Sequence, residues 1–105
     1  MTARVTLAEI DAVRMDVDAA VDRFKDSVLP ALRERDGFEG VYVLTTREGK
    51  ALVMTLWATK EAAEKELASG FYAEQVEKFV TFFRAPPGRE TYEVVVAEAP
   101  EAVVA

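Results

Sequence analysis

Few kinds of side chain in this 105-residue sequence could take part in chemistry. It contains no histidine, no cysteine and no asparagine, and its only carboxamide side chain is Gln75. These absences exclude Ser-His-Asp and Cys-His catalysis, zinc sites built on imidazole or thiolate, and haem held by a histidine. We therefore expect no metal site, and any general base must be Asp, Glu, Lys, Tyr or water.

Glu9 is the carboxylate that we single out as a candidate base. It falls in an extended apolar run, residues 3–12, where acidic side chains disfavour β structure. An inward-pointing Glu9 would be a partly buried carboxylate able to abstract a proton. The alternative is an edge position at which Glu9 pairs with an arginine or a lysine.

The only tryptophan, Trp57, ends the apolar run "LVMTLW". It can fill the gap between sheet and helix as part of the core, or it can form the wall of a ligand pocket at the end of its strand. Tyr42 and Tyr92 lie in strand patterns, where a tyrosine is often a structural residue with a wet hydroxyl. Either tyrosine could also orient a phenolic ligand, so all three residues are ligand-binding candidates.

A second group of aromatic residues gathers in the last helical segment, residues 71–83. Phe79 and Phe83 are four residues apart, which places them on one helix face as an ordinary core pair. Together with Tyr72 they could instead form the flexible wall of an apolar cavity. We keep both interpretations, and the second makes Tyr72, Phe79 and Phe83 candidate ligand-binding residues.

Hydrophobic spacing predicts the elements that position these residues. Asp16 and Thr59 are expected as helix N-caps, and Pro30 as the cause of a kink or restart in the first helix. The expected strands span residues 3–12, 40–46, 50–58 and 90–98, and the expected helices span 17–36 and 60–83, the second interrupted at Gly70. The order β-α-β-β-α-β predicts an α+β, ferredoxin-like fold, in which an antiparallel four-stranded sheet has both helices on one face.

The face of the sheet without helices is expected to be apolar. Residues 51–58 place Val53 and Trp57 on one side and Leu52, Met54 and Leu56 on the other, so neither side resembles a solvated surface. An apolar surface of this extent is a liability on a monomer. We therefore expect a homodimer in which two sheets pack face to face.

Charge and composition limit the other partners and the location. The net charge is −6 without a basic cluster, which disfavours nucleic acid and anionic membranes. No segment approaches the ~20 apolar residues needed to cross a bilayer, and charges interrupt the first apolar run, unlike in a signal peptide. With the lack of cysteine, these features predict a cytoplasmic protein. We expect one domain, residues 1–98, and a C-terminal tail, residues 99–105.

Three motifs suggest a family. They are "VLPAL" at residues 28–32, "GFEGVYVL" at 37–44 and "TLWATKEA" at 55–62, followed by "TYEV" at 91–94. In combination these motifs resemble the dimeric α+β barrel superfamily, and within it the antibiotic-biosynthesis-monooxygenase-like (ABM) group. The resemblance covers residues 3–98 and implies a homodimer with a ligand cavity between sheet and helices in each subunit.

The resemblance also implies an oxygenase activity, and the residue types that this chain lacks limit which oxygenase activity it can be. Members include cofactor-independent oxygenases of anthrone or quinol-like aromatics, as well as haem-degrading oxygenases. Trp57 matches the tryptophan that borders the cavity in several active members. Haem-degrading members also need a histidine and an asparagine, which this chain lacks, so the resemblance implies no cofactor. The anthrone-type members use an asparagine too, and it is missing here.

Two functional hypotheses follow. The first is a cofactor-independent monooxygenase-like protein that binds a small apolar aromatic or polyketide-like molecule between Trp57 and residues 71–83, with Glu9 as the base. The second is a non-catalytic ligand-binding or stress-related module built on the same barrel. The family resemblance favours the first hypothesis, whereas the lack of histidine and asparagine favours the second.

Overall fold

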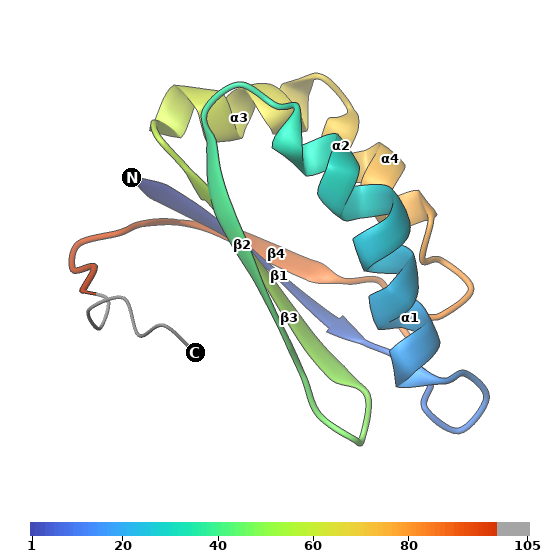
Figure 1. Cartoon of the computed structure of the whole chain (residues 1–105). Coiled ribbons are helices and arrows are strands. Elements are labelled where there is room, and N and C mark those ends of the chain that lie inside the picture. The colour runs from blue at the N-terminus through green and yellow to red at the C-terminus, as the bar shows by residue number, and fades with distance from the viewer. Residues whose placement is uncertain (99–105) are drawn as a thin grey trace, which may run out of the picture.

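The computed structural model describes residues 1–98, so the tail expected at residues 99–105 lies outside the described residues. Four strands alternate with helical segments along the chain (Figure 1). Their bounds are β1 Thr2–Glu9, α1 Val17–Arg23, the π-helical turn η1 Phe24–Val28, α2 Leu29–Arg33, β2 Phe38–Thr45, β3 Lys50–Trp57, α3 Lys60–Ala68, α4 Phe71–Glu77 and β4 Gly88–Glu93.

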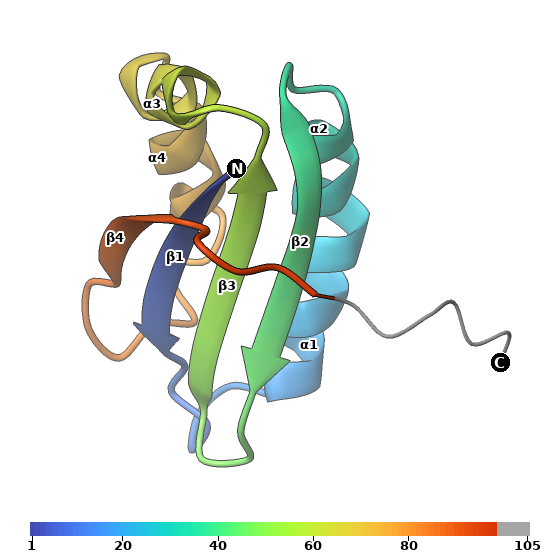
Figure 2. The same ribbon diagram turned by 90° about the vertical axis from the view of Figure 1, so that its left-hand side faces the viewer.

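The strands form one antiparallel sheet in the order β2-β3-β1-β4. All of the helical segments lie on the same face of this sheet, and the opposite face is left uncovered (Figures 1 and 2). This arrangement confirms the predicted α+β, ferredoxin-like fold. Within residues 1–98, each helix is too short or too polar to span a bilayer.

The first helical segment begins and changes pitch where the sequence predicts. The Asp16 carboxylate accepts a hydrogen bond from the Asp18 backbone N–H, which caps α1. Pro30 has no N–H to donate to the preceding turn, and the chain widens there into η1, where the Leu29 N–H bonds to the Phe24 carbonyl. The predicted restart near Val28 therefore takes the form of a π-helical turn followed by α2.

Two glycines fix tight turns that position the cavity walls. Gly49 in the β2–β3 hairpin has φ +99°, and a Cβ there would lie 2.3 Å from the Ile10 carbonyl oxygen. Gly70 has φ +82° and ends the α3 segment, so that α4 starts in a new direction at Phe71. Both conformations lie in the left-handed region that glycine adopts without strain.

Three element boundaries differ from the expectation. Strand β1 ends at Glu9 rather than near residue 12, because Ile10 bridges to Phe83 and the chain turns away there. Helix α4 ends at Glu77 rather than near Phe83, and residues 78–83 form turns closed by shorter backbone bonds such as Phe79 N–H to Val76 O.

Strand β4 also differs, since it spans Gly88–Glu93 rather than residues 90–98. Its partner β1 begins at Thr2, which pairs with Glu93, and the last backbone bond runs from Val94 N–H to the Met1 carbonyl. Residues 94–98 thus have no further strand to pair with. They leave the sheet on its uncovered side (Figures 1 and 2).

Two hydrophobic clusters join the helices to the sheet. One contains Val28, Leu32, Trp57 and Ala63, and the other contains Ile10, Ala20 and Phe82. The partly buried Phe79 packs against both clusters and connects them. The space that these side chains leave between sheet and helices is the candidate site.

Candidate functional site

A cavity of about 130 Å³ lies between the sheet and the helical layer. Its floor consists of alternate residues of β1, β3 and β2, and its walls consist mainly of apolar side chains of α1, η1, α2, α4 and the turns after α4. The lining includes Arg4, Thr6, Ala8, Ala51, Val53, Thr55, Trp57, Phe24, Val28, Glu66, Phe71, Tyr72, Gln75, Phe79 and Phe83. An apolar cavity of this size accommodates a single aromatic ring.

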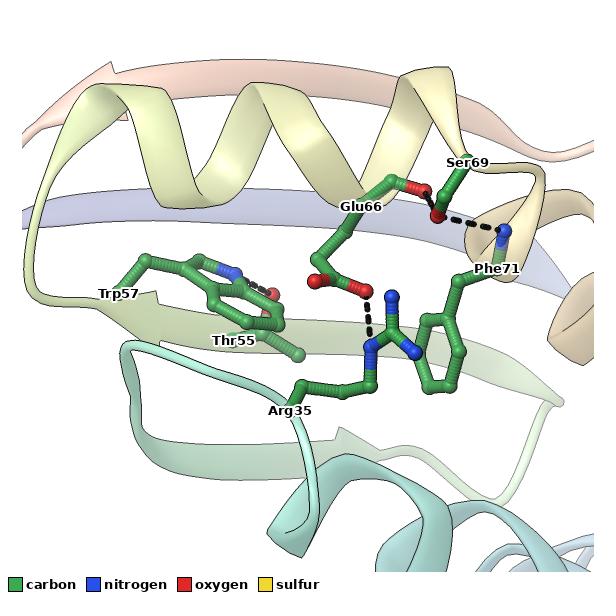
Figure 3. Close-up of polar contacts among 6 residues, drawn as sticks. All are labelled: Arg35, Thr55, Trp57, Glu66, Ser69 and Phe71. Carbon is green, nitrogen blue, oxygen red and sulfur yellow. Dashed lines mark hydrogen bonds and ion pairs between the residues drawn. The ribbon is translucent and has the colours of Figure 1, made fainter.

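Trp57 has both of the roles that the sequence left open. Its side chain is only 2% exposed and belongs to a core cluster, and the same indole also lines the cavity. The indole Nε1–H donates to the Thr55 hydroxyl at 2.9 Å, and the Phe38 ring packs edge-on at 5.7 Å between centroids (Figure 3 shows the Thr55 bond). These contacts hold the indole in one orientation.

Arg4 is a buried cation on the cavity wall. It lies in β1, where residues 2, 4, 6 and 8 share the face toward the helices, and it is 7% exposed. Its guanidinium lies 5.3 Å from the centroid of the Tyr72 ring, and the Tyr72 hydroxyl shares a hydrogen bond of 2.9 Å with the Thr6 hydroxyl. Burial lowers the pKa of Arg4 below its ordinary value, yet arginine stays protonated in proteins.

Glu66 is the carboxylate of the cavity lining. It projects from α3, is almost fully buried, and accepts a hydrogen bond from the Arg35 Nε at 2.5 Å (Figure 3). The Arg35 guanidinium also lies 4.5 Å from the centroid of the Phe71 ring. Arg35 therefore joins the loop after α2 to the start of α4 and to α3, across one end of the cavity.

The predicted aromatic residues Tyr72, Phe79 and Phe83 all line the cavity. Tyr72 lies on α4 as expected, whereas Phe79 and Phe83 lie in the turns after it. The Phe79 and Phe83 rings stack with centroids 6.3 Å apart. All three side chains therefore lie at the cavity, although the helix that was expected to carry them ends earlier.

Tyr42, Tyr92 and Glu9 are placed elsewhere. In the register of the sheet, Tyr42 pairs with Met54 and Tyr92 pairs with Ala3, which puts both tyrosines on the uncovered face. A hydrogen bond to the Glu90 carboxylate raises the pKa of the exposed Tyr92 phenol. Glu9 is exposed at the end of β1 and does not line the cavity. Strand alternation is the reason that none of the three faces the helices.

Arg4, Thr6 and Glu66 are cavity residues that sequence reasoning missed. The alternation of polar Arg4 and Thr6 with apolar Val5 and Leu7 in β1 marks one strand face as polar, which is a usable signal. Glu66 follows the buried Ala63 by three residues, so it shares the buried face of α3. In the described part of the chain, no group of three or more acidic side chains is arranged to hold a metal ion.

No family model matches the chain. A segment of 54 residues is 39% identical to two uncharacterized proteins of Mycobacterium tuberculosis, Rv2558 and MT2635. This segment is 50% of the present chain and only 23% of the length of those relatives.

Solved structures share the fold at low sequence identity. NE2512 of Nitrosomonas europaea, a protein of unknown function, matches with a TM-score of 0.72 and 21% identity over 96% of this chain and 95% of its own. The ActVA-Orf6 monooxygenase of Streptomyces coelicolor, solved with nanaomycin D, matches with a TM-score of 0.71 and 15% identity. The match covers 94% of this chain and 91% of the ActVA-Orf6 chain. The cofactor-independent oxygenase SnoaB of Streptomyces nogalater matches with a TM-score of 0.70 and 10% identity. The match covers 91% of this chain and 94% of the SnoaB chain.

These matches extend over nearly the whole chain, and they confirm the predicted resemblance at the level of the fold. The chain has the fold of the ABM-like proteins of the dimeric α+β barrel superfamily.

Proposed function

We propose that this protein binds a small aromatic molecule between its sheet and its helices and acts on it as a cofactor-independent monooxygenase. The observation that carries the proposal is the apolar cavity beside Trp57, which has a few polar groups at its edge. A concave apolar site with a small number of converging polar groups is the usual form of a ligand pocket. Two structures of the same fold belong to a monooxygenase and a cofactor-independent oxygenase.

The chemistry would need a base and a group that stabilises the substrate anion. Once a proton is removed from an activated aromatic substrate, the resulting carbanion can react with dioxygen to give a hydroperoxide. Loss of water from the hydroperoxide leaves one oxygen atom on the substrate as a carbonyl oxygen, so the substrate itself supplies the electrons. Glu66 replaces Glu9 as the candidate base, because Glu66 is the carboxylate that lines the cavity. Arg4 supplies a positive charge that would stabilise a developing oxyanion in a site shielded from water.

A binding function without turnover is the second candidate, and one contact favours it. The Glu66 carboxylate is already held by Arg35, so its negative charge is balanced and its hydrogen-bonding capacity is partly used. The same cavity would then hold a ligand without converting it.

Oxygen uptake with hydroquinone, a single-ring quinol that matches the size of the cavity, separates the two candidates. If the protein is an oxygenase, uptake depends on protein concentration and falls at least about 100-fold in Glu66→Gln, the range expected for loss of a general base. Glu9→Gln is the matched variant, and a loss of uptake in that variant alone would return the base role to Glu9. Quenching of Trp57 fluorescence by hydroquinone without any uptake would favour the binding module.

We also propose that the protein is a homodimer formed through the uncovered face of the sheet. We call this surface the open face, and define it as residues 3, 5, 7, 42, 44, 52, 54, 56 and 92. Leu7, Tyr42, Leu44 and Tyr92 on this face are each at least half exposed. Exposed apolar patches of this kind mark interaction surfaces, and a second copy of the same face is complementary in chemistry.

A further inference from the structure

A buried positive charge without a counter-ion lies on the cavity wall. Arg4 is 7% exposed, and within residues 1–98 no carboxylate oxygen is within ion-pair distance of its guanidinium. The carboxylate that also lines the cavity, Glu66, bonds to Arg35 instead. A buried charge is normally paired, because its removal from water is unfavourable unless another charge or several hydrogen bonds compensate.

The neighbours of Arg4 compensate only part of this cost. Its guanidinium lies 5.3 Å from the centroid of the Tyr72 ring, which supplies a cation–π contact. A second guanidinium, that of the exposed Arg89, lies at the same distance from the same ring. Arg89 adds positive charge to this end of the site in a chain whose net charge is −6. The Tyr72 end of the cavity is therefore locally cationic.

Neutral donors stand beside Arg4 as well. Thr6 and Tyr72 are both residues of the cavity lining, and their hydroxyls share one hydrogen bond of 2.9 Å. Two hydroxyls carry two hydrogens and their mutual bond uses one, so one O–H remains available to a ligand atom. A guanidinium and a free O–H at one place form a set of donors for an anionic oxygen.

We propose that this end of the cavity, formed by Arg4, Thr6 and Tyr72, binds the carboxylate of an aromatic acid whose ring occupies the apolar part of the same cavity. A monoanionic carboxylate balances the single buried charge of Arg4, and its two oxygens match the planar guanidinium fork. The volume of about 130 Å³ suits one ring with a small substituent.

The inference rests on the proposed function, since it uses the same cavity, and it narrows the ligand to a carboxylate-bearing aromatic. The ring would contact apolar side chains such as Phe24, Val28 and Phe79. The acid group would neutralise the positive charge of Arg4. A neutral aromatic of the same shape would leave that charge without a counter-ion. Discrimination between acid and amide is therefore the measurable consequence.

Benzoate and benzamide test this proposal, because they have nearly the same shape and differ in charge. The chain has one tryptophan, so the protein labelled with nitrogen-15 gives one indole N–H signal, that of Trp57, which lines the cavity. Titration of each compound at neutral pH should move this signal, and benzoate should bind at least about tenfold more tightly, the effect of one charge-assisted hydrogen bond. Arg4→Gln should abolish the difference, and Arg4→Lys should retain part of it.

Arg14→Gln is the matched control, because Arg14 is 82% exposed and lies outside the cavity lining. It should keep the preference for benzoate. Equal affinities for benzoate and benzamide in the unmodified protein would overturn the carboxylate site and leave the aromatic cavity intact. If neither compound, nor 2-naphthoate or 2-naphthamide, moved the Trp57 signal, the proposed function itself would fail. The comparison in the unmodified protein decides the proposal even if Arg4→Gln does not fold.

Discussion

At the scale of single residues, one side chain can serve both stability and binding. Trp57 fills the junction of β3 with α2 and α3, and one part of its indole faces the cavity. Its N–H is satisfied by Thr55, so the ring is buried without an unpaired donor. The indole is thus a rigid wall, and the mobile parts of the site must lie elsewhere.

Substitution of Trp57 tests how much of the fold depends on this wall. Trp57→Ala should lower the free energy of unfolding by about 3–5 kcal/mol, because it removes a large buried ring and enlarges the cavity. Trp57→Phe should cost less, about 1–2 kcal/mol, since most of the ring contact survives and only the bond to Thr55 is lost. Urea unfolding followed by far-UV circular dichroism measures both. Val13→Ala, at a position 97% exposed, is the control and should change stability by less than about 0.5 kcal/mol.

At the scale of elements, the end of the cavity near Trp57 is held closed by a single ion pair. Arg35 reaches from the loop between α2 and β2 to Glu66 on α3, and its guanidinium also packs on Phe71 at the start of α4 (Figure 3). Gly70 lies between α3 and α4 in a left-handed conformation. One guanidinium therefore links the loop after α2 to α3 and to the start of α4, in addition to the hydrophobic cluster around Trp57.

Breaking this ion pair should destabilise the protein. Arg35→Met leaves a nearly buried Glu66 carboxylate without its partner, and we expect a loss of about 3 kcal/mol, at the low end for buried pairs because Arg35 is partly exposed. The double variant Arg35→Met, Glu66→Met should recover most of that loss, since no unpaired charge remains. Chemical unfolding of the three proteins measures the effect.

The exposed ion pair between Lys60 and Glu64 on α3 is a matched comparison. Lys60→Ala should change stability by less than about 1 kcal/mol, because solvent screens a pair in which both side chains are mostly exposed. A loss as large for Lys60→Ala as for Arg35→Met would show that burial of Glu66 does not determine the strength of the Arg35 contact.

At the scale of the whole molecule, the two faces of the sheet differ in what covers them. The face toward the helices forms one side of the cavity, whereas the open face carries exposed Leu7, Tyr42, Leu44 and Tyr92. Residues 94–98 leave β4 on the side of the open face, with Val95 and Val96 more than four-fifths exposed. Both features point to a second copy as the missing cover.

The proposed homodimer predicts a concentration-dependent mass and stability. Light scattering at micromolar concentration should give twice the mass of the chain, and the unfolding midpoint should fall on dilution because association stabilises the folded state. Leu44→Lys, which introduces a charge on the open face, should yield a monomer. Val13→Lys, which lies in the loop after β1, should remain a dimer. A monomeric mass for the unmodified protein would contradict the packing of two open faces.

Much of the fold could be predicted because local rules and global packing agree. The helix caps at Asp16 and Thr59, the pitch change before Pro30 and the break at Gly70 each follow from one residue's chemistry, and the structure shows all four. The ends of β1, α4 and β4 could not be predicted. They depend on pairing between distant residues, such as Ile10 with Phe83.

The residues of the candidate site likewise fall into those that the sequence predicted and those that depend on contacts between distant residues. The sequence by itself determined the α+β order of elements, the apolar character of the sheet face without helices, and the aromatic side chains Trp57, Tyr72, Phe79 and Phe83 that line the cavity. Only the tertiary structure decided that Tyr42 and Tyr92 face away from the cavity, and that Arg4 and Glu66 face into it. The physical reason is that spacing along the chain defines which residues share a face, whereas the packing of helices on the sheet decides which face is enclosed.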